Sequence, residues 1–270
     1  MITSTSNPQI KAIRKLKERK ERLASGLYYL EGLRIVYEAI QRGVDLDKII
    51  IAPELAISKA AHDIKSKADQ KNIPILEVNA DVFRSMSLKE GPQGVAAVGH
   101  QQWATLDAIN PQQGDLWVAL DSVADPGNLG TILRTCDAVG GRGIILLDQS
   151  TDPYDPTSIR ASMGALFSQT LVKTDFSTFS LWKQKCSVTV IGTSDSAKVD
   201  YHHIQYPDPI ILLMGSERNG LLDKHYQICS QVVRIPMLGH SDSLNLSVAT
   251  AVVLYEILNQ RRADDIHHSG

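Results

Sequence analysis

Cysteine is scarce in this chain, with Cys136, Cys186 and Cys229 far apart along the sequence. An odd number at wide spacing favours reduced thiols over a disulfide framework or a metal site, as is typical of cytoplasmic proteins. No apolar run reaches the ~18 residues of a membrane span, and the start MITSTSNPQIKAIRK has no signal-peptide core. We therefore expect a cytoplasmic protein with no membrane partner.

Excess positive charge is also missing, since the formal net charge is -2 over 270 residues. This balance excludes a uniformly basic nucleic-acid binder but allows a local basic patch. Such a patch lies between Asn7 and Arg22, where seven basic residues stand against two acidic ones. Pro8 after Asn7 indicates a capped helix start. The pattern fits a solvated helix face and a phosphate-binding face equally well.

Glycine-rich nucleotide-binding loops are absent as well. The chain contains neither G-x-G-x-x-G nor G-x-x-x-x-G-K-[ST], and the spacing of Gly127 and Gly130 in GNLG does not bring backbone onto a pyrophosphate. These absences argue against an NAD enzyme and against a P-loop nucleotide hydrolase.

What is present is a repeated alternation of apolar strands and helices, which predicts an α/β protein. Up to residue 100, strands are expected within 28–31, 46–53, 73–78 and 94–100, and helices within 32–43, 57–72 and 80–88. The polar segment 101–114 contains Pro and Gly and is the predicted linker. Beyond it, strands are expected at 116–121, 143–148, 187–193, 209–215 and 232–237, with a loop at 122–130 and a helix at 131–140.

Continuous apolar strands separated by helices favour a mainly parallel sheet covered on both faces. In such sheets ligands bind beyond the carboxyl ends of the strands. The polar loops 122–130, 215–220 and 237–247 fall there. Ser243, Asn245 and Ser247 are all good helix caps, and one helix needs only one of them. The surplus polar groups therefore predict a binding site at that helix start.

Three stretches stand together in this half: DPGNLGTILRTCDAVG, LLMGSERNGL and RIPMLGHSDSLNLSVATAVVLYE. In order, spacing and residue type they resemble the three motifs of the SpoU (TrmH-like) family of RNA ribose 2′-O-methyltransferases, within the SPOUT superfamily. The similarity extends to DPTSIRASMGALF and to the N-terminal half. It implies a deep trefoil knot in the C-terminal sheet, S-adenosylmethionine as the methyl donor, a homodimer and an RNA substrate, most naturally ribosomal RNA.

The resemblance also assigns roles to residues. Arg134 would orient the reacting hydroxyl, Asn128 would cap its helix and reach across the site, and Glu217 would brace Arg134 or the knot backbone. Ser243 and Asn245 would point into the catalytic centre, which leaves Ser247 for capping. The expected cofactor-binding residues are Thr193, Gly215, Gly220, Ile235, Met237 and Leu244.

The expected RNA contacts are Lys15, Lys17, Arg19, Arg160 and Ser162. A surface ion pair of Arg134 with Asp137, and a structural salt bridge for Arg160, are the alternatives. His202 and His203 are adjacent, but no third ligand at suitable spacing accompanies them, so we expect surface histidines and no metal.

The expected organisation is a basic helix at 1–24, an RNA-binding domain at 25–100, the linker, a methyltransferase domain at 115–265 and a tail at 266–270. Three other functions stay open: a non-catalytic RNA-binding or ribosome-assembly protein of the same fold, a tRNA 2′-O-methyltransferase, and a methyltransferase that protects an antibiotic site. Nothing in the sequence identifies the modified nucleotide.

Overall fold

The computed structural model describes residues 1–268, and side chains as far as residue 263. The chain divides into two compact units. The first contains Met1–Gln102 together with Asp152–Phe167, and the second contains Trp103–Thr151 and the chain from Ser168 onward. The segment Asp152–Phe167 thus interrupts the second unit in sequence but packs in the first, which the sequence did not predict.

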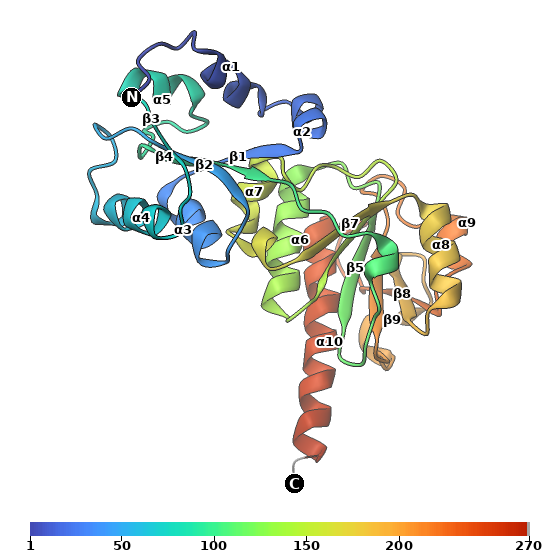
Figure 1. Ribbon diagram of the computed structural model, residues 1–270. Coiled ribbons are helices and arrows are strands. Elements are labelled where there is room, and N and C mark those ends of the chain that lie inside the picture. Colours follow the sequence, from blue (N-terminus) through green and yellow to red (C-terminus); the bar gives the residue numbers. More distant parts are fainter. Residues whose placement is uncertain (269–270) are drawn as a thin grey trace. The chain divides into compact units, whose positions relative to one another are not determined.

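The first unit is built on a four-stranded sheet in the order β1-β4-β2-β3. Its strands are β1 (Leu27–Glu31), β2 (Leu46–Ile51), β3 (Ile75–Glu77) and β4 (Val95–His100). β4 pairs antiparallel with β1 and β2, whereas β2 and β3 are parallel. Helices α3 (Leu33–Gln41) and α4 (Lys59–Gln70) cover one face, and α1 (Pro8–Lys15) and α5 (Ala80–Met86) cover the other (Figure 1). The predicted strands and helices of this half are present.

The expected single basic helix is two helices, α1 and α2 (Arg19–Ser25). Asn7 caps α1 as predicted, because its side chain accepts from the backbone N–H of Gln9. The chain turns after Leu16, where Arg22 Nη1 donates to the carbonyls of Leu16 and Lys17 at 3.0 and 2.8 Å. A buried arginine satisfies the carbonyls at the turn, and the helix therefore ends there.

Arg22 also binds the segment that interrupts the second unit. Its guanidinium is 1% exposed and lies 2.7 Å from Asp152 Oδ2 and 3.1 Å from Asp155 Oδ2. A buried charge needs such partners, since desolvation without them is costly. Arg22, which the sequence placed in the basic patch, is therefore not available to phosphate. The pair holds α7 (Pro156–Ser162) in the first unit, beside β1.

The second unit contains a seven-stranded, fully parallel sheet in the order β7-β6-β5-β10-β8-β11-β9. The strands are β5 (Leu116–Asp121), β6 (Gly143–Leu147), β7 (Thr170–Thr174), β8 (Thr189–Thr193), β9 (Val199–Asp200), β10 (Ile210–Met214) and β11 (Gln231–Arg234). This confirms the predicted parallel sheet and adds β7 and β9. Strand order alone does not define a knot, so the trefoil threading stays a prediction.

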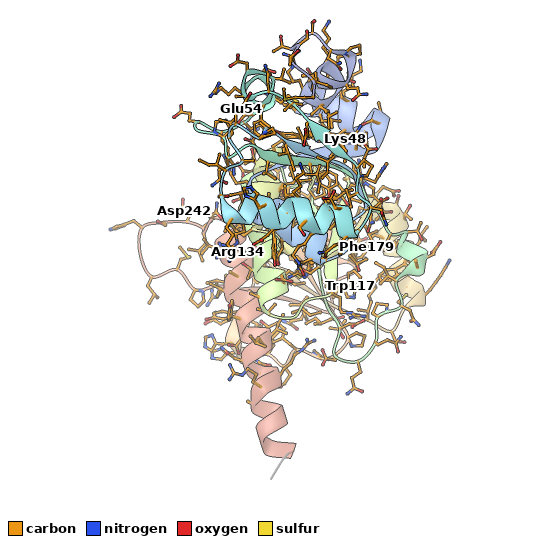
Figure 2. All side chains as sticks on the ribbon, turned by 60° about the vertical axis from the view of Figure 1, so that its left-hand side comes forward. Lys48, Glu54, Trp117, Arg134, Phe179 and Asp242 are labelled. Atoms are coloured by element: carbon orange, nitrogen blue, oxygen red, sulfur yellow. The ribbon has the colours of Figure 1, made fainter. Side chains whose placement is uncertain are left out.

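Helices cover both faces of this sheet, as its apolar strands require. The helices α6 (Pro126–Ala138) and α10 (Leu246–His268) pack together on one face (Figure 1). The helix α8 (Phe176–Lys185) covers the other, where Phe179 and Trp182 belong to the same hydrophobic cluster as Trp117. Phe179 and Trp117 are labelled in Figure 2. The short α9 (Asp223–Tyr226) follows the loop after β10.

The predicted linker and part of the predicted tail have regular or buried structure. In the predicted linker, Leu106 and Ile109 are buried in the core of the second unit. The helix α10 extends to His268, so residues 266–268 of the predicted tail are helical, and 269–270 lie outside the described residues. Within the described part of the chain, no helix has both the length and the apolar character to cross a membrane.

Candidate active site

A cavity of about 630 Å³ lies in the second unit at the carboxyl ends of β8 and β10. Its walls come from three segments that are distant in sequence: the end of β8 with the loop after it, the loop after β10, and the loop between β11 and α10. This is the predicted edge of the parallel sheet. The cavity is lined by all of the expected cofactor-binding residues, Thr193, Gly215, Gly220, Ile235, Met237 and Leu244, and by Glu217, Ser243 and Asn245.

The loop after β10 is a tight bend that requires glycine at both ends. A Cβ on Gly215 would lie 2.0 Å from the carbonyl oxygen of Gly220, and Gly220 has a φ of +58°. The N–H of Gly220 donates to the carbonyl of Ser216 at 3.0 Å, which closes the bend. Gly215 is thus needed because the loop approaches itself. The expected close approach to a cofactor is not required to explain it.

Glu217, within this bend, binds the loop between β5 and α6. Its carboxylate accepts from the backbone N–H groups of Ala124 and Asp125 at 3.1 and 3.3 Å. It also accepts from Asn128 Nδ2 at 3.2 Å. Among the described residues Glu217 makes no hydrogen bond or ion pair with Arg134, the first of its two expected partners. The backbone that it binds belongs to the loop before α6, and the second expected partner, the backbone of a knot, stays a prediction.

Asn128 and Asn245 continue the network to the start of α10. Asn245 Nδ2 donates to Asn128 Oδ1 at 3.0 Å, while Asn245 Oδ1 accepts from the N–H of Ser247 at 2.9 Å. The acceptor role of Oδ1 towards a backbone N–H determines the orientation of the amide, so the donor must face Asn128. A chain of hydrogen bonds, Glu217–Asn128–Asn245, therefore joins the three motif segments.

Two capping predictions were wrong. Asn128 lies inside α6, whose cap is Asp125; the Asp125 side chain accepts from the Asn128 N–H at 2.8 Å. At α10 the cap is Asn245, and Ser247 lies within the first turn. Both errors have one cause: several adjacent residues can cap a helix, and tertiary contacts decide which does so.

Arg134 lies on α6 and has an exposed side chain (Figure 2). It is not among the residues that line the cavity. The alternative ion pair with Asp137 does not form, because Asp137 accepts from Ser168 Oγ instead. Among the described residues Arg134 makes no ion pair, so its guanidinium is accessible to a ligand. Within one chain, the structure brings together every expected catalytic residue except this one.

A polar cluster around α9, which follows the cavity loop, was missed by sequence reasoning. His225, 1% exposed, contacts Asp121 Oδ2 through Nε2 at 2.5 Å, and its Nδ1 accepts from the N–H of Leu222 at 2.7 Å. Nε2 therefore carries the proton and donates to Asp121. Lys224 Nζ lies 2.9 Å from Asp121 Oδ2 and 2.8 Å from Asp148 Oδ2. An acid at a strand end is the one signal that could have pointed to this cluster.

Hydrogen bonds determine the ionisation of Asp121. Burial acts to raise its pKa, but hydrogen bonds from His225, Ser122 and Lys224 outweigh it and hold the pKa of Asp121 well below its usual value. The carboxylate therefore stays charged and fastens α9, just after the cavity loop, to the end of β5.

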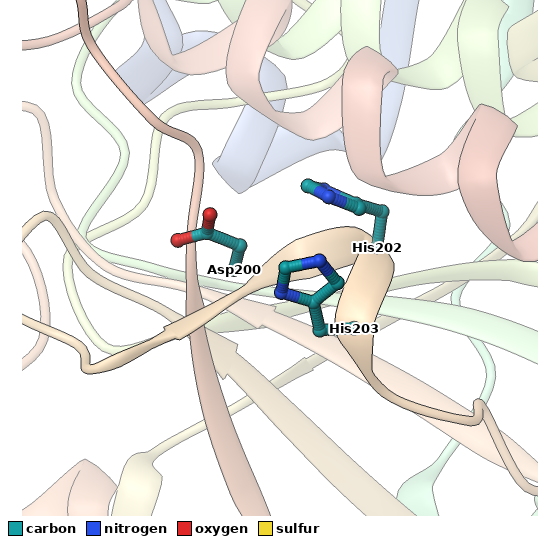
Figure 3. Close-up of side chains that lie close together, drawn as sticks. All are labelled: Asp200, His202 and His203. Atoms are coloured by element: carbon teal, nitrogen blue, oxygen red, sulfur yellow. The ribbon is translucent and has the colours of Figure 1, made fainter.

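The histidine pair has a third neighbour that its sequence spacing did not indicate. A carboxylate oxygen of Asp200 and a ring nitrogen of each of His202 and His203 lie within 4.8 Å of one another (Figure 3). Arg234 Nε donates to Asp200 Oδ1 at 2.6 Å, and this hydrogen bond keeps the pKa of Asp200 below its usual value. Because that guanidinium uses one oxygen and brings positive charge, we do not assign a metal here, and the expected absence of metal stays a prediction.

The expected RNA contacts lie in the first unit. Lys15, Lys17, Arg19 and Arg160 are exposed. Ser162 is fully buried and donates to the carbonyl of Ile159 at 2.8 Å, so the prediction that it touches RNA was wrong. The family resemblance placed Ser162 at the RNA, whereas its side chain packs inside the first unit.

Comparison with known proteins bears on both units. The model of the SpoU rRNA Methylase family matches residues 115–255, and that of the MRM3-like substrate binding domain matches residues 7–97. The structure is similar to an AdoMet-bound rRNA methyltransferase from Sinorhizobium meliloti, with 36% identity, a TM-score of 0.88 and coverage of 96% of this chain and 97% of that one.

Two curated relatives of this chain are named as 23S rRNA 2′-O-methyltransferases. The 23S rRNA (uridine(2479)-2′-O)-methyltransferase of Streptomyces viridochromogenes is 29% identical over 91% of this chain and 87% of its own. The 23S rRNA (guanosine(2553)-2′-O)-methyltransferase of Bacillus subtilis is 27% identical over 95% of this chain and 98% of its own.

Proposed function

Because this chain belongs to the SpoU rRNA methylase family, we propose that it transfers a methyl group from S-adenosylmethionine to a ribose 2′-hydroxyl of ribosomal RNA. The observation that carries the proposal is the Glu217–Asn128–Asn245 network at the mouth of a cavity at the carboxyl ends of the parallel strands. The relatives named above carry this activity in their names, and the AdoMet-bound neighbour covers nearly the whole chain.

The cavity suits this donor in size, polarity and charge. Its volume of about 630 Å³ is that of an ordinary ligand pocket. Ile235, Met237 and Leu244 offer apolar surface for an adenine ring. Among the charged lining residues, the carboxylates of Asp195, Glu217 and Asp242 outnumber the guanidinium of Arg218. When bound, S-adenosylmethionine supplies an activated methyl group on a positively charged sulfur, and acidic walls favour such a cation.

The residues of this chain would then position the ribose for attack. In-line attack requires the 2′-oxygen at near-attack distance and relieved of its proton. Glu217 and Asn128 hold the loops rigid, and Asn245 and Ser243 face the reaction space. Arg134 is a poor base, since the pKa of arginine exceeds ~12. Its guanidinium is suited to binding the adjacent phosphate and orienting the hydroxyl.

We also infer that two copies of the chain form the working enzyme. Arg134 is exposed and absent from the cavity wall, so within one chain the site lacks its phosphate-binding group. On α10, which packs against α6, Val248 and Tyr255 are 49% and 48% exposed on one stripe with Val252. A second copy covering this stripe would bury apolar area and bring the partner's α6 to the site.

The two units would divide the work. Residues 25–100 would bind RNA together with α7, and the rest of residues 115–265 would bind the donor and carry out transfer. Location in the cytoplasm stays a prediction. A tRNA substrate, or protection of an antibiotic site, remains an outcome of substrate mapping.

The Arg134→Ala variant tests the proposal. Calorimetry should give an unchanged dissociation constant for S-adenosylmethionine, because the side chain does not line the cavity. Transfer to ribosomal RNA should fall at least a hundredfold. The matched control is Arg84→Ala, an exposed arginine of α5, which should keep full activity.

Near-normal turnover of Arg134→Ala would overturn the role of the arginine. Failure of the unmodified protein to bind the donor would instead favour the non-catalytic RNA-binding protein.

A further inference from the structure

A second cavity, of about 440 Å³, lies entirely within the first unit and shares no lining residue with the cavity described above. Three segments line it: the turn from β1 into α3, the loop Leu88–Gln93, and α7 with Met163. The first two fall in the part of the chain that matches a substrate binding domain, and α7 falls in the part that matches the methylase. The buried pairs of Arg22 with Asp152 and Asp155 hold α7 in place here.

The inner wall of this cavity is apolar. Tyr29, Leu30 and Ile159 line it and are at most 3% exposed. Leu88 and Met163 also line it but are 39% and 42% exposed, so their apolar side chains are open to a ligand. Exposed large apolar residues gathered at a concave site indicate binding rather than folding.

Met163 has a strained backbone as well. Its φ is +54°, a left-handed conformation that costs a residue with a Cβ about 1 kcal/mol or more, and it ends α7 there. Glycine would avoid this cost, and the next residue, Gly164, also has a positive φ. A long thioether side chain kept at a position that favours glycine suggests that the side chain has a use.

The rim of the cavity is positively charged. Arg34, Lys89 and Arg160 line it with exposed side chains, and none of them forms an ion pair among the residues that the structure describes. Lys89 Nζ lies close to the start of α3, 2.7 Å from where a Cβ on Gly32 would be. Gly32 has no side chain to cap α3, and Gln93 Oε1 accepts from the N–H of Leu33 at 3.4 Å. The other N–H groups of the first turn leave the positive end of the helix dipole to add to these three charges.

The one acidic residue of the wall is already engaged. Glu31 accepts from Ser87 Oγ at 2.6 Å and from the N–H of Leu88 at 2.8 Å, and it contacts the Tyr29 hydroxyl at 3.4 Å. These bonds disperse its charge and hold the loop that carries Leu88 and Lys89. Glu31 is therefore a positioning residue for the rim.

We propose that this cavity binds one unstacked nucleotide of the RNA substrate. The base would lie on the apolar wall between Leu88 and Met163, and its phosphate would lie beside Arg34, Lys89 and Arg160. Proteins read RNA mainly at unpaired nucleotides, whose bases need an apolar or aromatic surface and whose phosphates need cations. This inference rests on the proposed function and adds to it a recognition site distinct from the reacting ribose.

The Met163→Gly variant tests the apolar wall. Because the backbone is already left-handed, the change should keep or raise the melting temperature while it removes the side chain. We expect the KM for ribosomal RNA to rise about tenfold, with kcat and donor affinity unchanged. A loss of RNA affinity in a protein that is no less stable cannot come from unfolding.

The Lys89→Gln/Arg160→Gln variant tests the charged rim. RNA affinity should fall. The slope of the logarithm of the binding constant against the logarithm of the salt concentration should become shallower by about one unit or more. The control is Lys59→Gln, an exposed lysine of the same unit on α4 that does not line the cavity.

Two failures are distinguishable. If the unmodified protein methylates RNA but the cavity variants match Lys59→Gln in KM and salt dependence, the nucleotide site is refuted. The proposed methyltransferase activity is then unaffected. If the unmodified protein transfers no methyl group to RNA, the proposed function fails first.

Discussion

Asn245 serves folding and the site with one side chain. Its Oδ1 accepts from the first turn of α10, and its Nδ2 donates to Asn128. The polar run before α10 predicted both uses but distributed them over three residues. The sequence could indicate that a surplus of polar groups existed; it could not indicate that one amide combines both tasks, because that depends on where α6 lies.

This double role can be separated by substitution. Asn245→Asp keeps an N-cap acceptor but loses the donor, so we expect nearly unchanged stability and at least tenfold slower transfer. Asn245→Ala loses both, and its free energy of unfolding should fall by about 1 kcal/mol in addition. Urea unfolding and transfer rates measure the two effects. Equal activity of Asn245→Asp and the unmodified protein would exclude the hydrogen bond to Asn128 from catalysis.

The low pKa of Asp121 leads to a prediction about the stability of the protein in acid. Its folded pKa is held below the unfolded value of about 3.9, so below that pH the unfolded chain binds a proton that the folded one does not. The stability contributed by Asp121 is therefore full above about pH 4 and is lost as the pH falls further. In Asp121→Asn, urea unfolding between pH 4 and 2.5 should show a shallower pH dependence. Parallel curves for the two proteins would contradict the cluster's role.

Among the elements, long apolar strands were predicted well and short or interrupted ones were not. Strands β5, β6, β8 and β10 are continuous apolar runs, whereas β9 has two residues and was missed. The start of α6 was read as a loop because Gly127 and Gly130 interrupt it, yet Asp125 caps it and Gly130 is buried within it. Tertiary packing of α6 with α10 overrides the low helix propensity of glycine there.

The exposed stripe on α10 predicts an oligomeric state. Tyr255→Glu should convert a dimer to monomers in sedimentation experiments, because it places a charge where the second copy would pack. Transfer should be lost together with the dimer, since Arg134 would no longer reach the partner's site. Leu181→Glu is the matched control, a leucine of α8 that is 60% exposed. A monomeric unmodified protein with full activity would refute this prediction.

At the scale of the whole molecule, the division of the chain into two units was predictable, but the boundaries of the units were not. Residues 152–167 interrupt one unit and pack in the other because Arg22, 130 residues before Asp152, binds them. Such a long-range pair has no local signal. Arg22 looked like one more member of a basic run, and its burial could be learned only from the structure.

The basic residues of the N-terminal patch other than Arg22 predict where a long RNA contacts the first unit. Lys15, Lys17 and Arg19 are exposed on α1, α2 and the turn between them. Reversing these three charges to Glu should weaken RNA binding and reduce its salt dependence, while donor affinity stays the same. Filter binding over a range of salt concentrations measures this. Unchanged affinity would mean that these basic side chains are only solvated and do not bind RNA.

The central claim is tested most directly by mapping ribose methylation in ribosomal RNA. RNA from cells that lack the gene should be incubated with the purified protein and isotopically labelled S-adenosylmethionine, then digested and analysed by mass spectrometry. We predict one labelled nucleotide, methylated on its 2′-oxygen and absent from that RNA before the reaction. A label on a base, or no label in any RNA while the donor binds, would contradict the account.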